Sequence, residues 1–445
     1  MSKKKILFVY PTSYDSQNRL IKGRKSFVPS RTLPYLAALT PARYGTRIVD
    51  ELVDDLNFEE DADLVALTGM LRHMPRAIDI AREFRKRGVP SIIGGVGAFS
   101  VRNMIEKSAV FESFIIGEAD KMWEEILNDF EKGRLKKFYE CIPPSELSGL
   151  PPARFDLLNM KKYIRSFVNA KDPIIPVETS RGCPHNCRFC LVTRYFGKKM
   201  RYRPIGEVVD EIKHYGVKHI MFTDDNIAIN PARARELFQA IKPLRVQWLG
   251  QFESRMIESP ELLRLAAESG CRTALVGIES IDKDNLISID KHQSAKLDFK
   301  DVVNGFKEAG IDLFASLIFG MDHDTALIID RTIEQSIELN IDAIIPWMLT
   351  PMPGTACYDD FKNDNRLTHE NYSLYDFWHL VIRPKQMPPA ELEKHYWQGL
   401  RRFYSLRSIL LRAWRGNKLN MTWFLCSLYF RRQVGKGLHP FAGNS

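Results

Sequence analysis

The stretch TSRGCPHNCRFC, from Thr179 to Cys190, contains three of the chain's seven cysteines. Cys183, Cys187 and Cys190 follow the spacing C-x3-C-x2-C, and no fourth cysteine lies nearby in the sequence. Structural zinc sites usually take four ligands, and ordinary four-iron clusters use four cysteines. Three close thiols without a fourth therefore favour a four-iron, four-sulfur cluster that keeps one iron open for a substrate or cofactor.

Two alternatives stay open for this cysteine loop. His185 lies inside the loop and would complete a zinc site of three Cys and one His, or the cysteines are grouped by chance. The start of the chain, MSKKKILFVYP, reads as a buried strand and not as a signal peptide, and no apolar stretch has the length of a membrane span. We therefore expect a cytoplasmic, reducing setting, in which close cysteines indicate metal or redox chemistry before disulfides.

The cysteine loop follows the first of six apolar segments that alternate with helical patterns. These segments are residues 173–180, 218–226, 246–252, 273–280, 312–321 and 343–351. Repeats of about 30 residues that pair a strand with a helix predict a partial (β/α)6 barrel of the TIM type. In such a barrel the chemistry lies on the loops after the strands, and the cysteine loop is the first of them.

The region before the barrel shows a second alternating pattern. Its apolar runs are residues 5–10, 46–52, 63–69, 90–97 and 112–120. Strands that alternate with helices predict a doubly wound, Rossmann-like parallel sheet, and hence an α/β fold. Four prolines in IPPSELSGLPPARFD indicate a linker after it. The expected units are a Rossmann-like domain (1–141), a linker (142–171), the partial barrel (172–369) and a C-terminal helical appendage (370–445).

With the aromatic Phe189 before its last cysteine, the loop resembles the signature of the radical S-adenosylmethionine (SAM) superfamily. The resemblance implies that Cys183, Cys187 and Cys190 hold a [4Fe-4S] cluster whose fourth iron is chelated by SAM. It also implies that an electron from the reduced cluster cleaves SAM to methionine and a 5′-deoxyadenosyl radical. The protein's contribution is then binding, orientation and the exclusion of competing reactions.

The same resemblance places SAM-binding residues in and after the barrel strands. The candidates are Phe189, Asp224, Asp225, Gln251, Glu279, Ser316, Ile318 and Met348. Asp224 and Asp225, in TDDN, stand where the family more usually has Gly-Gly-Glu. Either of them could instead cap the following helix, and ordinary packing at the strand ends is the alternative for the others.

A doubly wound sheet before such a barrel resembles the cobalamin-binding class of radical SAM enzymes. IIGGVGAF matches a Gly-Gly turn that lets the backbone approach the cofactor, and IIGEAD resembles a G-E-x-E-like segment with Asp120 in place of Glu. The implied cobalamin residues are Thr68, Gly94, Gly95, Gly117 and Glu118. Two features depart from the pattern: PTSYDSQNR lacks the D-x-H-x-x-G motif of a lower-ligand histidine, and GGVGAFS lacks a following His-Pro. The alternative is a degenerate domain that serves as a lid or dimer surface.

The resemblance as a whole implies cobalamin-dependent methylation of an unactivated carbon in a small-molecule or lipid-like substrate. A reductant such as flavodoxin or ferredoxin would supply the electron. The alternatives are a radical SAM cyclase or oxidative-modification enzyme without methyl transfer, and a non-catalytic iron–sulfur protein. The sequence identifies no catalytic side chain and names no substrate.

The C-terminal region is basic and aromatic. The chain has 64 Lys and Arg against 55 Asp and Glu, a net charge of +9 and a pI near 9.0, and residues 396–432 contain seven Arg and one Lys. Helices of this composition can lie on an anionic membrane, which would add membrane association to a cytoplasmic location. In the alternative, the apolar side chains pack on the barrel while Arg faces water. Nucleic acid is not expected as a partner, because no nucleic-acid module adjoins the basic stretch.

Overall fold

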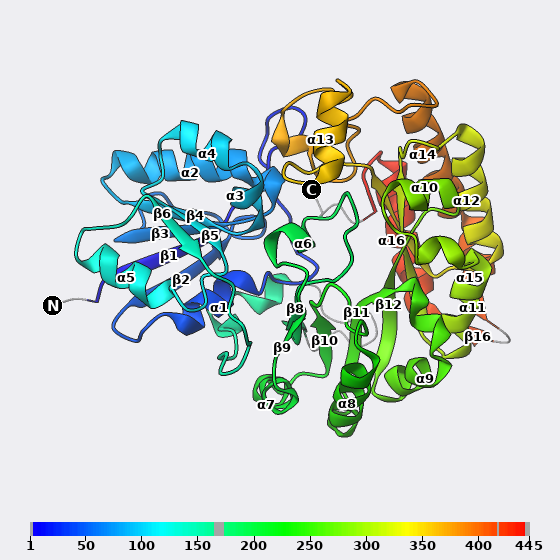
Figure 1. Ribbon diagram of the computed structural model, residues 1–445, viewed down its shortest axis with the longest axis horizontal. Coiled ribbons are helices and arrows are strands. Elements are labelled where there is room, and N and C mark those ends of the chain that lie inside the picture. Colours follow the sequence, from blue (N-terminus) through cyan, green and yellow to red (C-terminus); the bar gives the residue numbers. More distant parts are fainter. Residues whose placement is uncertain (1–2, 164–172, 416–417, 441–445) are drawn as a thin grey trace.

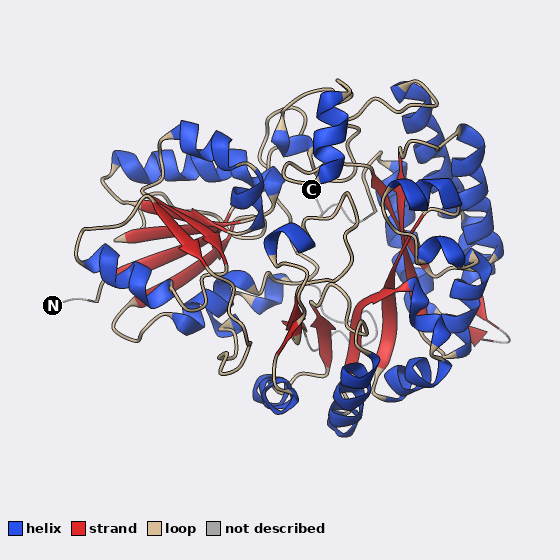
Figure 2. Cartoon of the chain, viewed as in Figure 1, coloured by secondary structure: helices blue, strands red, loops and turns tan. Residues whose placement is uncertain are grey.

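The computed structural model describes residues 3–163, 173–415 and 418–440 of the chain. Its main features are two parallel sheets that lie side by side, each accompanied by helices (Figures 1 and 2). This architecture confirms the predicted fold class, a doubly wound sheet followed by a partial barrel and C-terminal helices.

The first sheet has six parallel strands in the order β2-β1-β3-β4-β5-β6. The strands are β1 (Lys5–Tyr10), β2 (Gly45–Asp50), β3 (Leu64–Thr68), β4 (Ser91–Gly94), β5 (Ser113–Gly117) and β6 (Phe138–Cys141). The first five match the predicted apolar runs. The sequence analysis missed β6, because its four residues, FYEC, are too short to show a period.

Helices cover both faces of this sheet (Figure 1). One face packs against α1 (Thr32–Leu39) and α5 (Trp123–Glu131), and the other against α2 (Met74–Lys86), α3 (Val96–Ser100) and α4 (Arg102–Ser108). Successive residues of β1 alternate between the two cores: Leu7 joins the α2 side, and Phe8 joins the α1 side. Because both faces are buried, the strands read as continuous apolar runs.

The second sheet also has six parallel strands, in the sequential order β7-β10-β11-β12-β13-β14. The strands are β7 (Ile174–Val177), β10 (His219–Phe222), β11 (Gln247–Glu253), β12 (Cys271–Glu279), β13 (Asp312–Phe319) and β14 (Ala343–Met348). Among the described strands β7 and β14 do not pair with each other, so the sheet is an open, partial barrel.

The outer helices of the partial barrel connect its strands, as the repeats predicted. They are α7 (Ile205–Tyr215), α8 (Pro231–Ile241), α9 (Pro260–Glu268), α11 (Phe299–Glu308) and α12 (Ala326–Glu338). Shorter helices lie in the loops: α6 (Val192–Tyr195), α10 (Lys283–Ser288) and α13 (Ala356–Asn363). A two-stranded antiparallel ribbon of β8 (Ser180–Arg181) and β9 (Arg201–Tyr202) brackets the cysteine loop.

The C-terminal region adds α14 (Pro389–Phe403), α15 (Leu406–Ala413) and α16 (Met421–Gly435), with the strand pair β15 (Trp414–Arg415) and β16 (Lys418–Leu419) before α16. These helices pack on the partial barrel. The Tyr396 hydroxyl donates to the carbonyl of Pro346 at 2.8 Å, and Trp423 Nε1 donates to Asp312 at 2.6 Å. Long helices begin at 389 and not near 370, because residues 370–388 form an irregular segment over the strand ends.

The predicted linker is not a free tether where the structure describes it. Phe155 and Leu158 are buried in the core of the first sheet, and the Tyr163 hydroxyl donates to Asp50 at 2.8 Å. Residues 164–171 of the predicted linker lie outside the described residues.

Candidate functional site

The cysteine loop connects β8 to α6 and is held by backbone contacts. Gly182 has φ +99°, and a Cβ there would lie 2.5 Å from the carbonyl oxygen of Lys199, so this position requires glycine. The amide of Cys190 donates to the carbonyl of Cys187 at 3.0 Å. The amide of Arg188 donates to Ile289 at 3.1 Å, so the loop is anchored to the partial barrel as well as to itself.

His185 does not complete a zinc site in this structure. Its Nε2 lies 2.7 Å from a carboxylate oxygen of Glu253, at the end of β11. Within the described part of the chain, no three His, Cys, Asp or Glu side chains lie close enough together to hold one metal ion. The arrangement therefore gives no support to the zinc alternative.

The three thiols fit a multi-iron cluster better, because each thiolate of such a cluster binds a different iron and the thiols stay apart. All three sulfurs are free and half-buried, and all three cysteines line the same cavity. Burial raises the pKa of the Cys187 thiol to about 11 and that of Cys190 to about 12. These thiols hold their protons at neutral pH, so cluster assembly must displace them.

The cavity beside the cysteines has a volume of about 420 Å³ and opens at the carboxyl ends of the barrel strands. Seven of the eight residues predicted to bind SAM line it: Phe189, Asp225, Gln251, Glu279, Ser316, Ile318 and Met348. The eighth, Asp224, is buried and is not among the residues that line the cavity. The structure thus gathers side chains from five strand ends, although they are far apart in the sequence.

Glu279 is the most constrained of these residues. It has φ +65°, a left-handed conformation that is rare for glutamate, and it follows a bulge between β12 and β13. Lys291 Nζ donates to its Oε1 at 2.7 Å, and the Ser316 hydroxyl donates to its Oε2 at 3.2 Å. Trp347 Nε1 donates in turn to Ser316 at 3.1 Å. The carboxylate is therefore fixed in place at the wall of the cavity.

The sequence analysis did not find Lys291. It is buried at 8% exposure and is the one Lys or Arg among the described residues of the cavity wall. It also donates to the carbonyl of Gly277 at 2.8 Å, and a Cβ on Gly277 would lie 2.7 Å from its ammonium. Lys291 comes from the segment after α10 and not from a strand end, so no motif or period marked it.

Asp224 and Asp225 play different parts. Asp224 accepts hydrogen bonds from the Thr179 amide at 3.0 Å, the Thr179 hydroxyl at 2.7 Å and the Ser180 hydroxyl, so it secures the entry to the cysteine loop. Asp225 lines the cavity, and burial, together with the charges of Asp224 and Glu178, raises its pKa to about 7. Neither caps the following helix, because the N-cap of α8 is Asn230.

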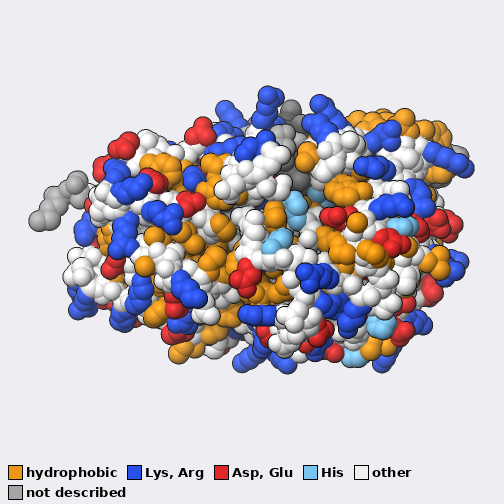
Figure 3. Space-filling view, turned by 90° about the horizontal axis from the view of Figure 1, so that it is seen from above, with side chains coloured by type: hydrophobic (Ala, Val, Ile, Leu, Met, Phe, Trp, Pro, Cys, Tyr) orange, Lys and Arg blue, Asp and Glu red, His pale blue; other side chains and the backbone are white. Residues whose placement is uncertain are grey.

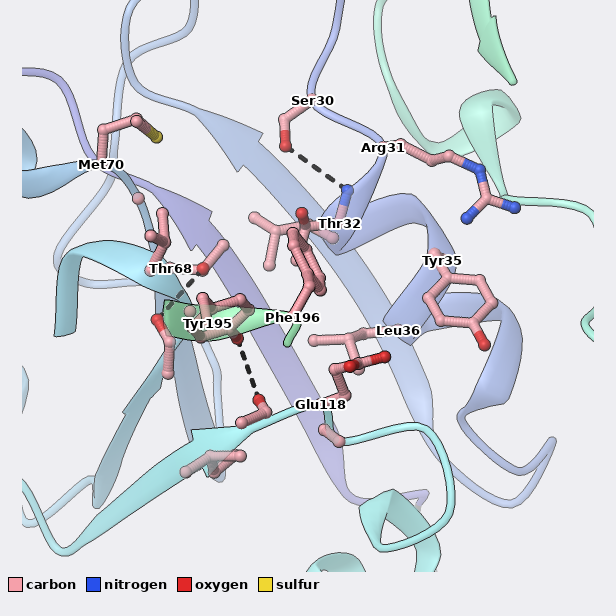
Figure 4. A pocket seen from close by; sticks show the side chains of 18 of the residues that line it. Ser30, Arg31, Thr32, Tyr35, Leu36, Thr68, Met70, Glu118, Tyr195 and Phe196 are labelled. Atoms are coloured by element: carbon pink, nitrogen blue, oxygen red, sulfur yellow. Dashed lines mark hydrogen bonds between the residues drawn. The ribbon is translucent and has the colours of Figure 1, made fainter. Parts of the chain in front are cut away.

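A second cavity, of about 620 Å³, lies at the carboxyl ends of the strands of the first sheet (Figure 4). The residues predicted for cobalamin all line it: Thr68, Gly94, Gly95, Gly117 and Glu118. Gly95 has φ +87°, and a Cβ there would lie 2.3 Å from the Thr68 hydroxyl. That hydroxyl donates to the carbonyl of Gly94 at 3.1 Å, so the turn that follows β4 leaves bare backbone at the cavity.

The second cavity fits a large cofactor with an extended tail. It occupies the crevice outside the strand ends, where doubly wound folds bind ligands. The Gly-Gly turn removes two side chains from its wall, and the lining is mainly apolar. Tyr195 of α6 closes one side, and its hydroxyl donates to the carbonyl of Gly117 at 2.9 Å (Figure 4). The residues present therefore fit cobalamin.

Glu118 also forms ion pairs that the sequence did not indicate. Its carboxylate accepts from Arg181 Nη1 at 2.6 Å and from Arg201 Nη2 at 2.6 Å, and both arginines belong to the β8–β9 ribbon. Arg181 also pairs with Asp120 at 2.9 Å and with Glu178 at 2.9 Å. This buried network joins the strand ends of the first sheet to the base of the cysteine loop.

The two cavities adjoin. Five residues line both of them: Phe189, Cys190, Val192, Asp225 and Phe377. Phe377 comes from the irregular segment before α14, and its carbonyl accepts from the Met348 amide at 2.7 Å. Groups bound in the two cavities would therefore meet beside the cysteine loop.

Comparison with known proteins agrees with this geometry. Residues 177–335, which hold the cysteine loop and most of the partial barrel, match the family model of the radical SAM superfamily. These residues therefore form a radical SAM domain. The match starts at the last residue of β7 and ends within α12, so it covers the cysteine loop and β10 to β13, whereas β14 and Phe377, which also line the cysteine cavity, lie beyond it.

Similarity to individual proteins extends over nearly the whole chain. Bacteriochlorophyllide d C-12(1)-methyltransferase of Chlorobaculum tepidum is 27% identical over 432 residues, which cover 95% of this chain and 92% of that protein. Two solved structures share the fold. One is the radical SAM methyltransferase TsrM of Kitasatospora setae with cobalamin and a [4Fe-4S] cluster, with TM-score 0.63, 18% identity and coverage of 89% of this chain and 85% of that one. The other is the cobalamin-dependent SAM radical enzyme OxsB, with TM-score 0.66, 12% identity and coverage of 97% and 71%.

Proposed function

We propose that this radical SAM protein is a cobalamin-dependent methyltransferase that acts on an unactivated carbon of a small-molecule or lipid-like substrate. The observation that carries the proposal is the common wall of the two cavities, formed in part by Phe189, Cys190 and Asp225. Methyl transfer needs the site that activates the substrate carbon and the site that holds the methyl carrier to be neighbours. Resemblance to a methyltransferase along 95% of the chain supports the same reaction.

The three cysteines would hold the cluster, and the walls of the two cavities would hold SAM and cobalamin. When bound, these groups supply the electron that cleaves SAM and the methyl group that is transferred. Asp225 and Glu279 offer carboxylates to the ammonium of SAM, and Lys291 offers a cation to its carboxylate. Backbone at Gly94 and Gly95 would approach cobalamin without obstruction by side chains.

The remaining task of the chain is to exclude water and hold the substrate. Phe189 and Phe377 lie between the cavities, and Trp347 lines the cysteine cavity with its indole fixed by Ser316. Aromatic and apolar walls at this point suit an apolar substrate. The name of the relative gives bacteriochlorophyllide d as its substrate, which is a compound of this class. For this chain we propose an apolar substrate and no particular compound. We also propose a reductant such as flavodoxin or ferredoxin as a partner. The C-terminal region would in addition make peripheral contact with a membrane.

The proposal is tested by anaerobic reconstitution with iron, sulfide and hydroxocobalamin. The protein should become brown, retain cobalamin on gel filtration and, with SAM and dithionite, form 5′-deoxyadenosine. No histidine is among the described residues that line the second cavity, so retained cobalamin should show a base-off spectrum. Cys187→Ala should lose the cluster and the nucleoside product, whereas Cys426→Ala, at a buried cysteine outside both cavities, should keep both.

Three outcomes separate the alternatives. Nucleoside formation without any cobalamin retention would favour a cyclase or oxidative enzyme over a methyltransferase. A cluster that is indifferent to SAM would identify a non-catalytic iron–sulfur protein. Stoichiometric zinc in a colourless protein would contradict both enzyme assignments.

A further inference from the structure

The net charge of the chain is concentrated at its C-terminal end. Residues 401–445 contain nine of the 64 Lys and Arg and none of the 55 Asp and Glu. The first 400 residues are therefore balanced, with 55 basic and 55 acidic side chains, and the C-terminal 45 residues account for the whole net charge of +9. So strong a segregation gives this end of the molecule a positive field.

Only some of these basic side chains stabilise the fold through buried hydrogen bonds or ion pairs. Arg412 is 3% exposed and donates to the carbonyls of Ile341 and Asp342, and Arg402 pairs with Asp330 and Glu334 of α12. Five other basic residues of α14 to α16 and the turn that follows are exposed, and none forms an ion pair with a described side chain: Arg401, Arg407, Arg431, Arg432 and Lys436.

Large apolar side chains are exposed in the same region. Of the thirteen exposed large hydrophobic side chains in the described residues, seven lie between 406 and 429. We call these seven the apolar patch: Leu406, Leu410, Leu411, Trp414, Met421, Leu425 and Tyr429. Four fall on or just after α15 and three on α16, two helices that pack against each other. None of the seven lines either cavity.

The patch has helical spacing and is not a set of stray side chains. On α16, Met421, Leu425 and Tyr429 follow each other at intervals of four residues and form one stripe. The opposite side of α16, with Trp423 and Phe430, is buried against the partial barrel. Figure 3 shows hydrophobic side chains gathered near the upper right edge of the molecule with Lys and Arg beside them, toward the end that holds the C-terminal helices. The packing alternative thus accounts for one side of these helices and leaves the other side uncovered by the residues that the structure describes.

Charge decides which partner suits this surface. A symmetric second copy would bring the same patch, and so the same five exposed cations, against itself. An anionic lipid surface offers opposite charge for the cations and an acyl boundary for Leu, Trp and Tyr side chains. No described helix is long and apolar enough to cross a bilayer, so the contact would be peripheral.

We propose that the apolar patch and its flanking cations bind an anionic phospholipid membrane surface. This deepens the membrane contact proposed above by naming the surface and the lipid charge, and it does not depend on methyl transfer. The apolar side chains of α15 and α16 enter the acyl boundary, while Arg407, Arg432 and Lys436 meet the headgroups.

The test is co-sedimentation of the full chain with vesicles of phosphatidylcholine, with or without phosphatidylglycerol. We expect the bound fraction to be about tenfold higher with phosphatidylglycerol and to fall with added salt. Leu410→Glu combined with Leu425→Glu should remove binding. Leu327→Glu is the matched control, because Leu327 is 59% exposed on α12, against 53% and 55% for the two patch residues.

The charge contribution is tested by Arg407→Glu combined with Arg432→Glu, which should weaken binding about tenfold. Lys213→Glu, at an exposed lysine of α7, should leave it unchanged. Thermal unfolding of each variant confirms that the fold is kept. Equal binding to both vesicle types, equal binding by patch and control variants, or a dimer in light scattering that Leu410→Glu dissociates would each overturn the proposal.

Discussion

Glu118 and Arg201 form a buried, two-hydrogen-bond ion pair between the first sheet and the cysteine-loop ribbon. Arg201 Nη2 donates to Glu118 Oε1 at 2.6 Å, and its Nη1 donates to Oε2 at 3.0 Å. The side chains of Arg201 and Glu118 are 4% and 2% exposed. Removal of one partner from such a pair leaves an uncompensated buried charge, which is costly.

We therefore expect Glu118→Gln to lower the free energy of unfolding by about 3 kcal/mol, because Arg181 and Arg201 lose their shared carboxylate. Urea denaturation measures this loss. Glu124→Gln is the control: that carboxylate is 67% exposed beside Arg43, so its loss should cost less than about 0.5 kcal/mol. If Glu118 instead served cobalamin alone, stability without the cofactor would be unchanged.

The sequence identified the parts of this site that follow one strand or one loop. The cysteine spacing, the glycines after β4 and Glu279 at the end of β12 are local features, and all of them line the two cavities. The partners of these residues come from elsewhere. Lys291 follows a helix, and Phe377 lies in an irregular segment. Such positions belong to no regular repeat of apolar residues along the sequence. Only the folded structure shows that they lie at the site.

Glu118 shows a second limit of sequence reasoning. Its motif predicted a cofactor contact, and it does line the cavity, but its carboxylate is held by two arginines more than 60 residues away. Asp224 is similar, since its oxygens are taken by Thr179 and Ser180. Spacing indicates that a polar residue lies at a strand end, and it does not indicate which neighbour that residue contacts.

Gly95→Ala should disturb the second cavity by more than the backbone strain of a positive φ alone would cause. The substitution places a Cβ at φ +87° and 2.3 Å from the Thr68 hydroxyl, so the turn must move. Gly88→Ala is a close control, because Gly88 has φ +74° with nothing within 4 Å of the added carbon. Each should lose about 1 kcal/mol of stability from backbone strain, with a further loss only in Gly95→Ala. Retention of hydroxocobalamin on gel filtration should fall in Gly95→Ala alone. Equal retention by both variants would contradict a role for this turn.

Lys291→Met should uncouple SAM binding from cluster assembly. The change leaves the buried carboxylate of Glu279 with the Ser316 hydroxyl and without its cationic partner, so the side chain loses one of the two contacts that hold it at the cavity wall. We expect the iron content to stay at the wild-type level while SAM affinity falls about tenfold, as measured by equilibrium dialysis of reconstituted protein. Lys296→Met, at an exposed lysine of the same segment, should match the wild type in both measurements. Loss of iron in Lys291→Met would show that Lys291 supports the cysteine loop instead.

SAM binding should depend on pH through Asp225. Burial and the nearby charges of Asp224 and Glu178 raise the pKa of Asp225 to about 7, so its carboxyl is neutral below that pH and ionised above it. Because an ammonium group prefers the ionised form, SAM affinity should rise up to about tenfold per pH unit below pH 7 and level off above it.

The free energy of unfolding should depend on pH in the opposite direction. The native state binds the extra proton between about pH 4 and 7, so the contribution of Asp225 to stability is lost as pH rises through that window. Asp225→Asn should flatten both profiles in dialysis and urea denaturation, whereas Glu258→Gln, at an exposed surface carboxylate, should preserve them. A SAM affinity that stays constant from pH 6 to 8 in the wild type would exclude Asp225 as the ammonium partner.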